Sequence, residues 1–452
     1  MWAAHALLPG GWARDVLLAW DGAGTLSAVN AGTPPPSGVA QAAGPLLPGL
    51  ANLHSHAFQR VFAGLTECRG ANEDSFWGWR EQIYRVAAAL TPEALEDIAT
   101  QLYIEMLCAG YTAVCEFHYV HLDAHGQPYA DPAEMSLRLV AAAERAGIGL
   151  TLLPVLYQAA GFGGVPPRPE QRRFVLSVDG LLDLVRRLRS EPVRVGAAPH
   201  SLRAVAPAAL HELVAGLHAI DEHAPLHIHI AEQQREVNDC IAWSGQRPVQ
   251  WLLDHAAVDS RWCLVHATHM HDSELRALAA SGATVGLCPS TEANLGDGAC
   301  RAAALAEAGG AWGIGSDSHA TVNPAEELRL LEYTQRLVLQ RRNVMATRER
   351  PDVAEQLWLS ALAGGARASG RNIAGLAAGQ QADFVCLSTD GALQDLAPPQ
   401  RLASHVFASH GPNAPRDVWV AGRRVVTEGE HALAARAAQR FVTARALLLR
   451  GE

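Results

Sequence analysis

The sequence contains no lysine: all 36 basic residues among its 452 are arginine. Schiff-base chemistry, attachment of pyridoxal phosphate and the P-loop all need a lysine amine, so these classes of enzyme are excluded. A binuclear metal centre bridged by a modified lysine is excluded for the same reason. Any anion that the protein recognises must therefore be bound by arginine, histidine, hydroxyl groups or backbone amides.

Long apolar runs and paired cysteines are also missing. No stretch reaches the ~18 uncharged apolar residues that a membrane span needs, so no contact with a membrane is expected. Residues 1–11 carry no basic segment of the secretory type, and none of the eight cysteines lies in a C-x-x-C spacing. We therefore expect no export signal, no disulfide framework and no zinc ribbon, but reduced, mostly buried thiols in a cytoplasmic protein.

Basic residues are outnumbered by acidic ones, 36 against 46, which gives a formal net charge of −10. This balance disfavours nonspecific binding to nucleic acid or to anionic membranes, so neither is an expected partner. Hydrophobic residues make up 49% of the chain, a globular composition, and 452 residues exceed what a single core usually supports. One large domain with a smaller one is the expected organisation.

Short apolar strands alternate with helical patterns through the middle of the chain. Residues 92–109, for example, predict a helix, because Thr91 can cap it, Pro92 suits its first turn and apolar residues recur at helical spacing. The alternation indicates an α/β fold, a (β/α)8 TIM barrel. Its expected strands are 46–53, 112–117, 149–156, 193–198, 226–230, 262–265, 284–287 and 312–315.

Both ends of the chain lack this alternation. Residues 16–20 and 26–29, like 382–387 and 417–423, are strand-like and separated by turn residues. The simplest assembly is a small β-sandwich domain built from both termini. We accordingly expect its N-terminal part at 1–45, the catalytic barrel at 46–374, and its C-terminal part with a tail helix at 375–452.

Polar side chains follow the ends of the predicted barrel strands. Two histidines at i and i+2 of a strand point to the same side, so His54 and His56 can bind one metal if other segments complete the set. A lone histidine is more often a buried structural donor, but the carboxyl ends of barrel strands converge on the face where active sites are built. The strand ends carry, in chain order, His54 and His56, His118 and Tyr119, His200, His229, His266, Glu292 and Asp317.

These motifs resemble the amidohydrolase superfamily, and within it the metal-dependent deaminases. The resemblance is carried by residues 47–56 (LPGLANLHSH), the His229-x-x-Glu232 pair, His266 and Ser316-Asp317. Other segments resemble the branch that deiminates a formimino derivative of glutamate in histidine degradation; they include 54–60 (HSHAFQR), 116–121 (EFHYVH), 200–203 (HSLR) and 290–298 (STEANLGDG). The resemblance implies hydrolysis of a linear amidine with release of ammonia.

The resemblance also implies a metal site and a catalytic group. A divalent metal is expected on His54, His56, His229 and Asp317, because three neutral nitrogens and one carboxylate suit zinc and leave a position for water. Zinc is expected, although iron and manganese also accept this set. Glu232 should take a proton from the water and deliver it to the departing nitrogen, and His266 should hydrogen-bond the attacking group. Glu232, His266 and Asp317 are therefore the expected catalytic residues.

The implied substrate is a small dicarboxylate amidine, and its two carboxylates need charge-assisted partners in an enclosed site. Arg80, in an aromatic-rich loop, and Arg203, shortly after His200, match the substrate-anchoring positions of the family. Gln59, Tyr119 and His200 complete the expected substrate-binding set as neutral or switchable donors. A homodimer is expected, since dimers are common among relatives.

Two alternatives remain open on the sequence. A related deaminase or chlorohydrolase could act on a purine, pyrimidine or triazine, although heteroaromatic substrates favour stacking rings over two pocket arginines. The barrel could also be a noncatalytic metal-binding or scaffolding protein, but binding alone requires neither Glu232 nor His266.

Overall fold

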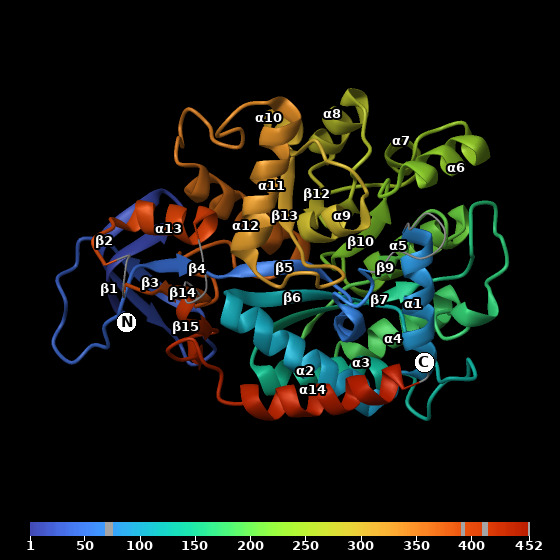
Figure 1. Ribbon diagram of the computed structural model, residues 1–452, viewed down its shortest axis with the longest axis horizontal. Helices are drawn as coiled ribbons and strands as arrows, with labels where there is room; N and C mark the ends of the chain where they lie inside the picture. Colours follow the sequence, from blue (N-terminus) through green and yellow to red (C-terminus); the bar gives the residue numbers. More distant parts are fainter. Residues whose placement is uncertain (68–75, 390–393, 409–414, 451–452) are drawn as a thin grey trace.

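A barrel of parallel strands lies at the centre of the computed structural model, which describes residues 1–67, 76–389, 394–408 and 415–450 (Figure 1). The expected (β/α)8 architecture is confirmed. Its strands are β5 (Leu50–Ser55), β6 (Tyr111–His118), β7 (Gly149–Leu156), β8 (Arg194–Val195) with β9 (Ala198–Pro199), β10 (Leu226–Ile230), β11 (Trp262–His266), β12 (Thr284–Leu287) and β13 (Ala311–Ile314).

The barrel consists of two runs of hydrogen-bonded parallel strands, β5-β6-β7-β8 and β10-β11-β12-β13, with β9 beside β7. Isolated parallel bridges join the runs: Ala197 with Leu226 on one side and Ser55 with Asp317 on the other. The second bridge connects the first barrel strand to the segment just after the last one. Closure of the barrel therefore brings the ends of β5 and β13 together.

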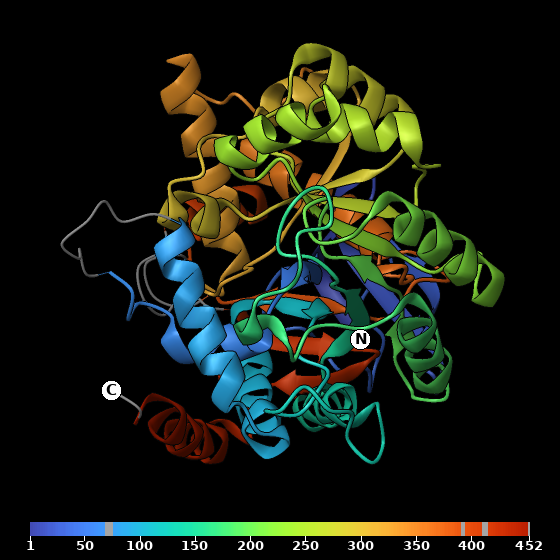
Figure 2. The same cartoon turned by 90° about the vertical axis from the view of Figure 1, so that its right-hand side faces the viewer.

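Helices surround the strands, as the view in Figure 2 shows. The helix predicted at 92–109 is confirmed as α2 (Pro92–Ala109): the Thr91 hydroxyl accepts from Ala94 N, and Gly110 ends the helix at a φ of 107°. The other helices of the barrel are α3 (Glu134–Ala146), α4 (Val178–Leu188), α5 (Pro207–Ile220), α6 (Gln234–Ser244), α7 (Pro248–His255), α8 (Asp272–Ser281), α10 (Ala302–Glu307), α11 (Pro324–Leu339) and α12 (Val353–Ser369). Four short or inserted elements lie near the strand ends: η1 (Ala57–Phe62), α1 (Phe76–Ala89), η2 (Pro169–Gln171) and α9 (Pro289–Leu295).

Both termini contribute to a separate seven-stranded sheet, as expected from the sequence. Its order is β16-β15-β14-β4-β1-β2-β3, and its pairs are antiparallel except for β1 with β4. Beyond it, α13 (Pro398–Phe407) packs on α11 and α12, and α14 (Ala434–Leu449) lies along α2 (Figures 1 and 2). The strands are β1 (Trp2–Leu8), β2 (Gly11–Trp20), β3 (Leu26–Asn30), β4 (Leu46–Pro48), β14 (Phe384–Leu387), β15 (Pro415–Val420) and β16 (Arg423–Val426).

The single strand predicted at 46–53 is wrong, because Gly49 divides it between the two sheets. Residues 46–48 form β4 in the terminal sheet, and β5 starts the barrel at Leu50. A Cβ atom at Gly49 would overlap the Thr112 side chain, so glycine permits the close approach of the two layers. The division into 1–45, 46–374 and 375–452 stays a prediction.

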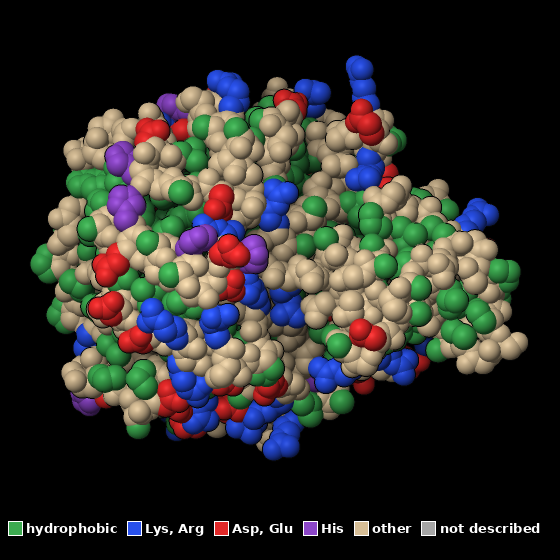
Figure 3. Space-filling view, turned by 180° about the vertical axis from the view of Figure 1, so that it is seen from behind, with side chains coloured by type: hydrophobic (Ala, Val, Ile, Leu, Met, Phe, Trp, Pro, Cys, Tyr) green, Lys and Arg blue, Asp and Glu red, His purple; other side chains and the backbone are tan. Residues whose placement is uncertain are grey.

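The surface carries mixed charge. On the face shown in Figure 3, basic and acidic side chains lie close beside one another. Among the described residues, no helix combines the length and the apolar character that crossing a membrane would require.

Packing of α12 on the barrel depends on Gly364. A Cβ atom there would overlap the backbone carbonyl of Trp312 on β13. We expect Gly364→Ala to lower the free energy of unfolding by about 1–3 kcal/mol, because backbone must move to accept the methyl group. Chemical denaturation compares this variant with Gly22→Ala, a turn position with open space around its Cβ. Equal stability of the two variants would contradict this packing.

Candidate metal centre and active site

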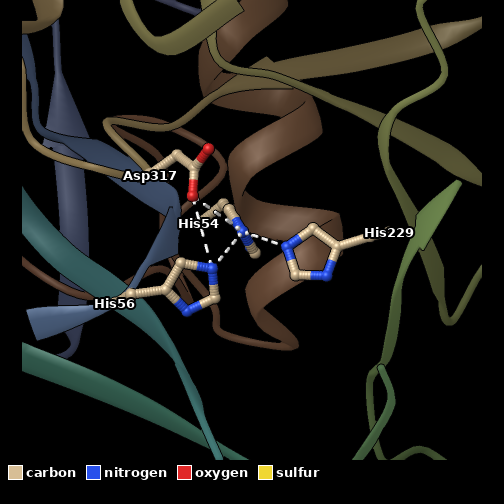
Figure 4. Close-up of side chains that lie close together, drawn as sticks. All are labelled: His54, His56, His229 and Asp317. Carbon is tan, nitrogen blue, oxygen red and sulfur yellow. Dashed lines mark hydrogen bonds and ion pairs between the residues drawn. The ribbon is translucent and has the colours of Figure 1, made fainter. Parts of the chain in front are cut away.

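Four side chains from three strand ends converge on one point (Figure 4). His54 Nε2 lies 2.9 Å from His229 Nε2 and 3.1 Å from His56 Nε2. Oδ1 of Asp317 lies 3.4 Å from His54 Nε2 and 3.3 Å from His56 Nε2. All four side chains are buried, and their ligand atoms lie within 4.8 Å of one another.

Hydrogen bonds to the backbone orient two of these imidazoles. His56 Nδ1 lies 2.9 Å from the carbonyl of Phe117, and His229 Nδ1 lies 3.1 Å from that of His200. A carbonyl can only accept, so each Nδ1 carries the proton and each Nε2 presents a lone pair. Burial lowers the pKa of His54, His56 and His229, which keeps the three rings neutral.

The geometry of this cluster fits a bound cation. His54 Nε2 lies 2.9–3.1 Å from the Nε2 atoms of His229 and His56, so the three rings direct nitrogen atoms at one point, where a cation can bind. Four ligands at the ~2.0–2.1 Å typical of zinc are about 3.3 Å apart in a tetrahedron, close to the observed spacings. The four residues predicted as metal ligands are thus brought together as one candidate metal site.

The seam between β5 and β13 sets the positions of these ligands. Asp317 N donates to the carbonyl of His54 (2.9 Å), and His56 N donates to that of Asp317 (3.3 Å). Nearby on the same two segments, Ser316 N donates to Asn52 Oδ1 (3.0 Å) and Asn52 Nδ2 donates to Ser316 Oγ (2.6 Å). The seam therefore fixes three of the four ligands relative to one another.

Glu116, near the end of β6, supports the turn that comes after β5. Its carboxylate accepts from Ser55 Oγ (2.7 Å) and from Ala57 N (2.6 Å), and the hydroxyl of Tyr103 donates to it at 3.2 Å. Burial raises the pKa of Glu116 to about 7. These contacts hold His56 and the start of η1, the turn that carries Gln59.

An acid–base group lies beside the metal cluster. His266 Nε2 is 3.8 Å from Glu232 Oε1 and 3.8 Å from Asp317 Oδ2, and its Nδ1 faces Glu292 Oε1 at 3.4 Å. Burial raises the pKa of Glu232, which favours a carboxyl that can both take and return a proton. Burial opposes a charged His266, but the carboxylates of Glu232 and Glu292 outweigh it and raise the histidine's pKa.

One pocket joins this group to the predicted substrate-binding residues. Gln59 Nε2 donates to the Tyr119 hydroxyl (3.0 Å), and the His200 ring packs against the His229 ring, with centroids 4.9 Å apart. Every residue predicted for the site lines the pocket except His54, which lies behind its wall within the metal cluster. The lining residues are His56, Gln59, Trp79, Arg80, Ile83, Tyr84, Tyr119, Tyr157, Phe174, His200, Arg203, His229, Glu232, His266, Leu295 and Asp317.

The two predicted arginines lie in the same pocket but on different supports. Arg80 belongs to helix α1 and not to a loop, so that part of the prediction is wrong. Arg203 lies in the turn after β9. Burial lowers the pKa of Arg80, whereas for Arg203 the carboxylates of Glu236 and Glu232 outweigh burial and raise it. Both guanidinium groups thus remain cations that face the pocket.

The sequence did not single out Tyr84, Tyr157 or Phe174, which also line the pocket. Tyr84 lies four residues after Arg80 on α1, so the two share a helix face. That spacing is the sequence feature that could have identified Tyr84 as a pocket residue. Other histidines have structural roles: Nε2 of His227 bonds to the carbonyl of Ala368 at 2.8 Å, away from the cluster.

The profile of the amidohydrolase family matches residues 46–425. The chain belongs to the amidohydrolase family. It is 51% identical to the formimidoylglutamate deiminase of Pseudomonas aeruginosa over 447 residues, which cover 98% of each chain. It is 28% identical to a 5-methylthioadenosine/S-adenosylhomocysteine deaminase of Shouchella clausii, with 83% of this chain and 80% of that one covered.

Solved structures of other proteins share this architecture. The crystal structure of an amidohydrolase from Brucella melitensis matches with a TM-score of 0.93 and 45% identity over 99% of each chain. An adenosine deaminase from Xanthomonas campestris with bound zinc matches with a TM-score of 0.79 over 98% of each chain. At 24% identity, the second likeness shows the fold alone.

Removal of His229 tests the metal centre. We expect His229→Ala to retain at least tenfold less metal than the parent, because the remaining ligands hold an ion poorly. Elemental analysis of the folded protein measures this loss. His227→Ala is the matched control: it removes a buried histidine two residues away on β10 whose side chain bonds to the backbone. Full metal content in His229→Ala would contradict the assignment.

Proposed function

We propose that this protein is a deiminase that hydrolyses N-formimino-L-glutamate to N-formyl-L-glutamate and ammonia, a step of histidine degradation. The observation that carries the proposal is the 51% identity to the Pseudomonas aeruginosa formimidoylglutamate deiminase over 98% of each chain. The pocket supports it, because the metal-binding cluster and two guanidinium groups face the same space.

The proposed ligands are His54, His56, His229 and Asp317, and the proposed metal is zinc. Three neutral nitrogens with one carboxylate suit this ion, and zinc is bound in the Xanthomonas campestris adenosine deaminase of the same fold. A divalent ion held there would lower the pKa of a water toward ~7.

Glu232 carries the proton in the proposed reaction. Its carboxylate accepts a proton as a water oxygen attacks the formimino carbon, and the carbon–nitrogen double bond becomes a single bond. Glu232 delivers this proton to the terminal nitrogen, then takes the proton of the new hydroxyl group and transfers it to the same nitrogen, which leaves as ammonia while the carbon–oxygen bond becomes the formyl carbonyl. One water is consumed for each ammonia released.

His266 and Asp317 complete the catalytic group. His266 Nε2 lies 3.8 Å from both Glu232 Oε1 and Asp317 Oδ2. A protonated His266, held by Glu292 on its other nitrogen, donates a hydrogen bond to the attacking oxygen and stabilises the developing charge. Asp317 orients His266 and is a second acceptor for a proton of the water.

The rest of the pocket recognises the substrate. Arg80 and Arg203 bind the two carboxylates, since a guanidinium matches a carboxylate in charge and geometry. Gln59, Tyr119 and His200, which line the same pocket, donate to the amidine end in the proposed complex. Burial and the nearby guanidinium of Arg203 lower the pKa of His200, so it acts as a neutral donor or acceptor.

Two further features of the protein are proposed. A homodimer would cover Leu337 and Val338 at the end of α11, whose exposed fractions are 80% and 61%.

A cytoplasmic location fits the seven cysteines of the described residues, none of which is paired in a disulfide. Light scattering and cell fractionation test these two points.

Ammonia release tests the proposed function directly. The metal-loaded protein should release ammonia from N-formimino-L-glutamate and at least 100-fold more slowly, in kcat/KM, from guanine, cytosine and adenosine. The estimate rests on the loss of one charge-assisted pair or more in a neutral heterocycle, about 3 kcal/mol. A preference for any of the three heterocycles would identify a nucleobase deaminase instead.

Replacement of the proton carrier separates chemistry from binding. We expect Glu232→Gln to lower kcat by roughly 10² or more, because the amide keeps the shape but cannot accept the proton. Metal content should stay at the parent level, since Glu232 is not among the proposed ligands. Near-normal turnover would show that another group carries the proton.

Replacement of an arginine tests substrate recognition. We expect Arg203→Met or Arg80→Met to reduce kcat/KM for N-formimino-L-glutamate by roughly 30-fold or more, about 2–5 kcal/mol, through loss of a carboxylate partner. Formimino compounds that lack the carboxylate in question should lose much less. Arg186→Met, at an exposed arginine paired with Asp183, is the control. If the pocket variants matched the parent with the dicarboxylate, the glutamate derivative would be the wrong substrate.

A further inference from the structure

Gln171 connects two tyrosines that line the pocket. It lies in η2, and its side chain has no exposed surface. Its Nε2 donates to the Tyr157 hydroxyl oxygen at 2.6 Å and to that of Tyr84 at 2.9 Å. Both tyrosines are themselves buried, with exposed fractions of 7% and 5%. One amide thus links three segments of the chain behind the pocket wall.

The orientation of this amide is fixed on its other side. Gln171 Oε1 accepts from the backbone N–H of Arg168 at 2.8 Å. A flipped amide would place its NH2 group against that N–H, so the oxygen must face Arg168 and the NH2 group must face the phenols. Both hydrogens of the NH2 group are therefore given to tyrosine oxygens.

This arrangement determines what the phenols can offer. An NH2 group cannot accept from them, so each tyrosine must use its O–H hydrogen elsewhere. Tyr84 and Tyr157 also interact with each other. A hydrogen bond between two phenols uses only one of their two O–H hydrogens. Burial raises the pKa of Tyr157, which keeps its hydroxyl protonated. At least one O–H donor is thus left for the pocket.

The phenols lie among the cations of the pocket. The Arg80 guanidinium carbon lies 5.5 Å from the centre of the Tyr84 ring, and the positive charges of Arg203 and Arg80 both act on Tyr157. Guanidinium groups donate only, and Gln171 already occupies one acceptor position of each phenol oxygen. Donors therefore predominate in this part of the wall, and they match a carboxylate better than the NH2 group of an amide.

We propose that Tyr84 and Tyr157 form a specificity-determining pair that donates at least one hydrogen bond to a substrate carboxylate beside Arg80 and Arg203, and that Gln171 is the residue that positions the pair. This inference rests on the proposed function, since it names further groups that recognise the same substrate. It explains why a fully buried amide lies behind a wall of the pocket. It also predicts selection of the dicarboxylate over its amide.

The double variant Tyr84→Phe/Tyr157→Phe tests the proposal with the metal-loaded enzyme. We expect KM for N-formimino-L-glutamate to rise ~10–100-fold while kcat changes less than about threefold, because a hydrogen bond to a charged group is lost before the chemical step. The comparison substrates are N-formimino-L-glutamine and N-formimino-4-aminobutyrate, which lack the side-chain and the α-carboxylate respectively. For one of the two, the KM of variant and parent should agree within about twofold, which identifies the carboxylate.

Gln171→Met tests positioning without a change of charge. In the parent it should raise KM for the dicarboxylate several-fold, and in the double phenylalanine variant it should change KM by less than about twofold. A merely structural role would lower kcat, metal content or thermal stability in both backgrounds. Tyr129→Phe is the matched control, since it removes a phenol that accepts from Arg173 and does not line the pocket.

Two results would overturn the inference: an unchanged KM in the double variant, or an equal rise in KM for all three substrates.

Failure of this inference is distinguishable from failure of the proposed function. Parent enzyme that deiminates none of the formimino compounds would refute the function. Calorimetry with glutarate, a dicarboxylate without the amidine, would then still test the phenols: we expect ~10-fold or greater loss of affinity in the double variant, and equal affinity would refute their role.

Discussion

The seam between β5 and β13 is the contact on which the rest of the site depends. Its hydrogen bonds, between His54 and Asp317 and between Asn52 and Ser316, close the barrel and hold candidate metal ligands at the same time. Gly315 permits this approach, because a Cβ atom there would lie 2.8–3.0 Å from backbone and Cβ atoms of His54. Barrel closure and assembly of the metal cluster are therefore one structural event.

Several strained backbone positions lie at the strand ends that carry the candidate site residues. Ala231, His266, Ala267 and Asp317 all have positive φ, between 45° and 67°, although none is a glycine. Such conformations cost about 1–3 kcal/mol each and persist where the surroundings determine them. Here the surroundings include the seam at Asp317 and the bond from Ala267 N to Ile230 O. The strain turns the chain at the carboxyl ends of the strands so that side chains face the pocket.

Short-range periodicity made part of the site predictable from the sequence, whereas features that depend on distant packing were missed. His54 and His56 could be paired because a strand repeats every two residues, and the start of α2 could be predicted from Thr91 and Pro92. The break at Gly49 depends on Thr112, which is distant in the sequence, and could not be read from an apolar run. Tyr84 and Tyr157 look like ordinary core residues by spacing, and the amide that links them comes from a third segment. Arg80 was expected in an aromatic-rich loop, whereas it lies on helix α1.

The two ends of the pocket differ in the charge that they attract. Because the chain contains no lysine, the cationic groups of the anion-attracting end are arginines. Neutral imidazoles and the Asp317 carboxylate attract a cation at one end, while guanidinium groups, which keep their charge at any accessible pH, attract anions at the other. The two ends are electrostatically connected: burial raises the pKa of Glu232 and the positive charge of Arg203 partly opposes that rise, while the carboxylates of Glu236 and Glu232 outweigh burial and raise the pKa of Arg203. A carboxylate bound against Arg203 offsets that positive charge. In the proposed complex, a substrate carboxylate at Arg203 would therefore make Glu232 more basic at the stage when the proposed reaction requires it to accept a proton.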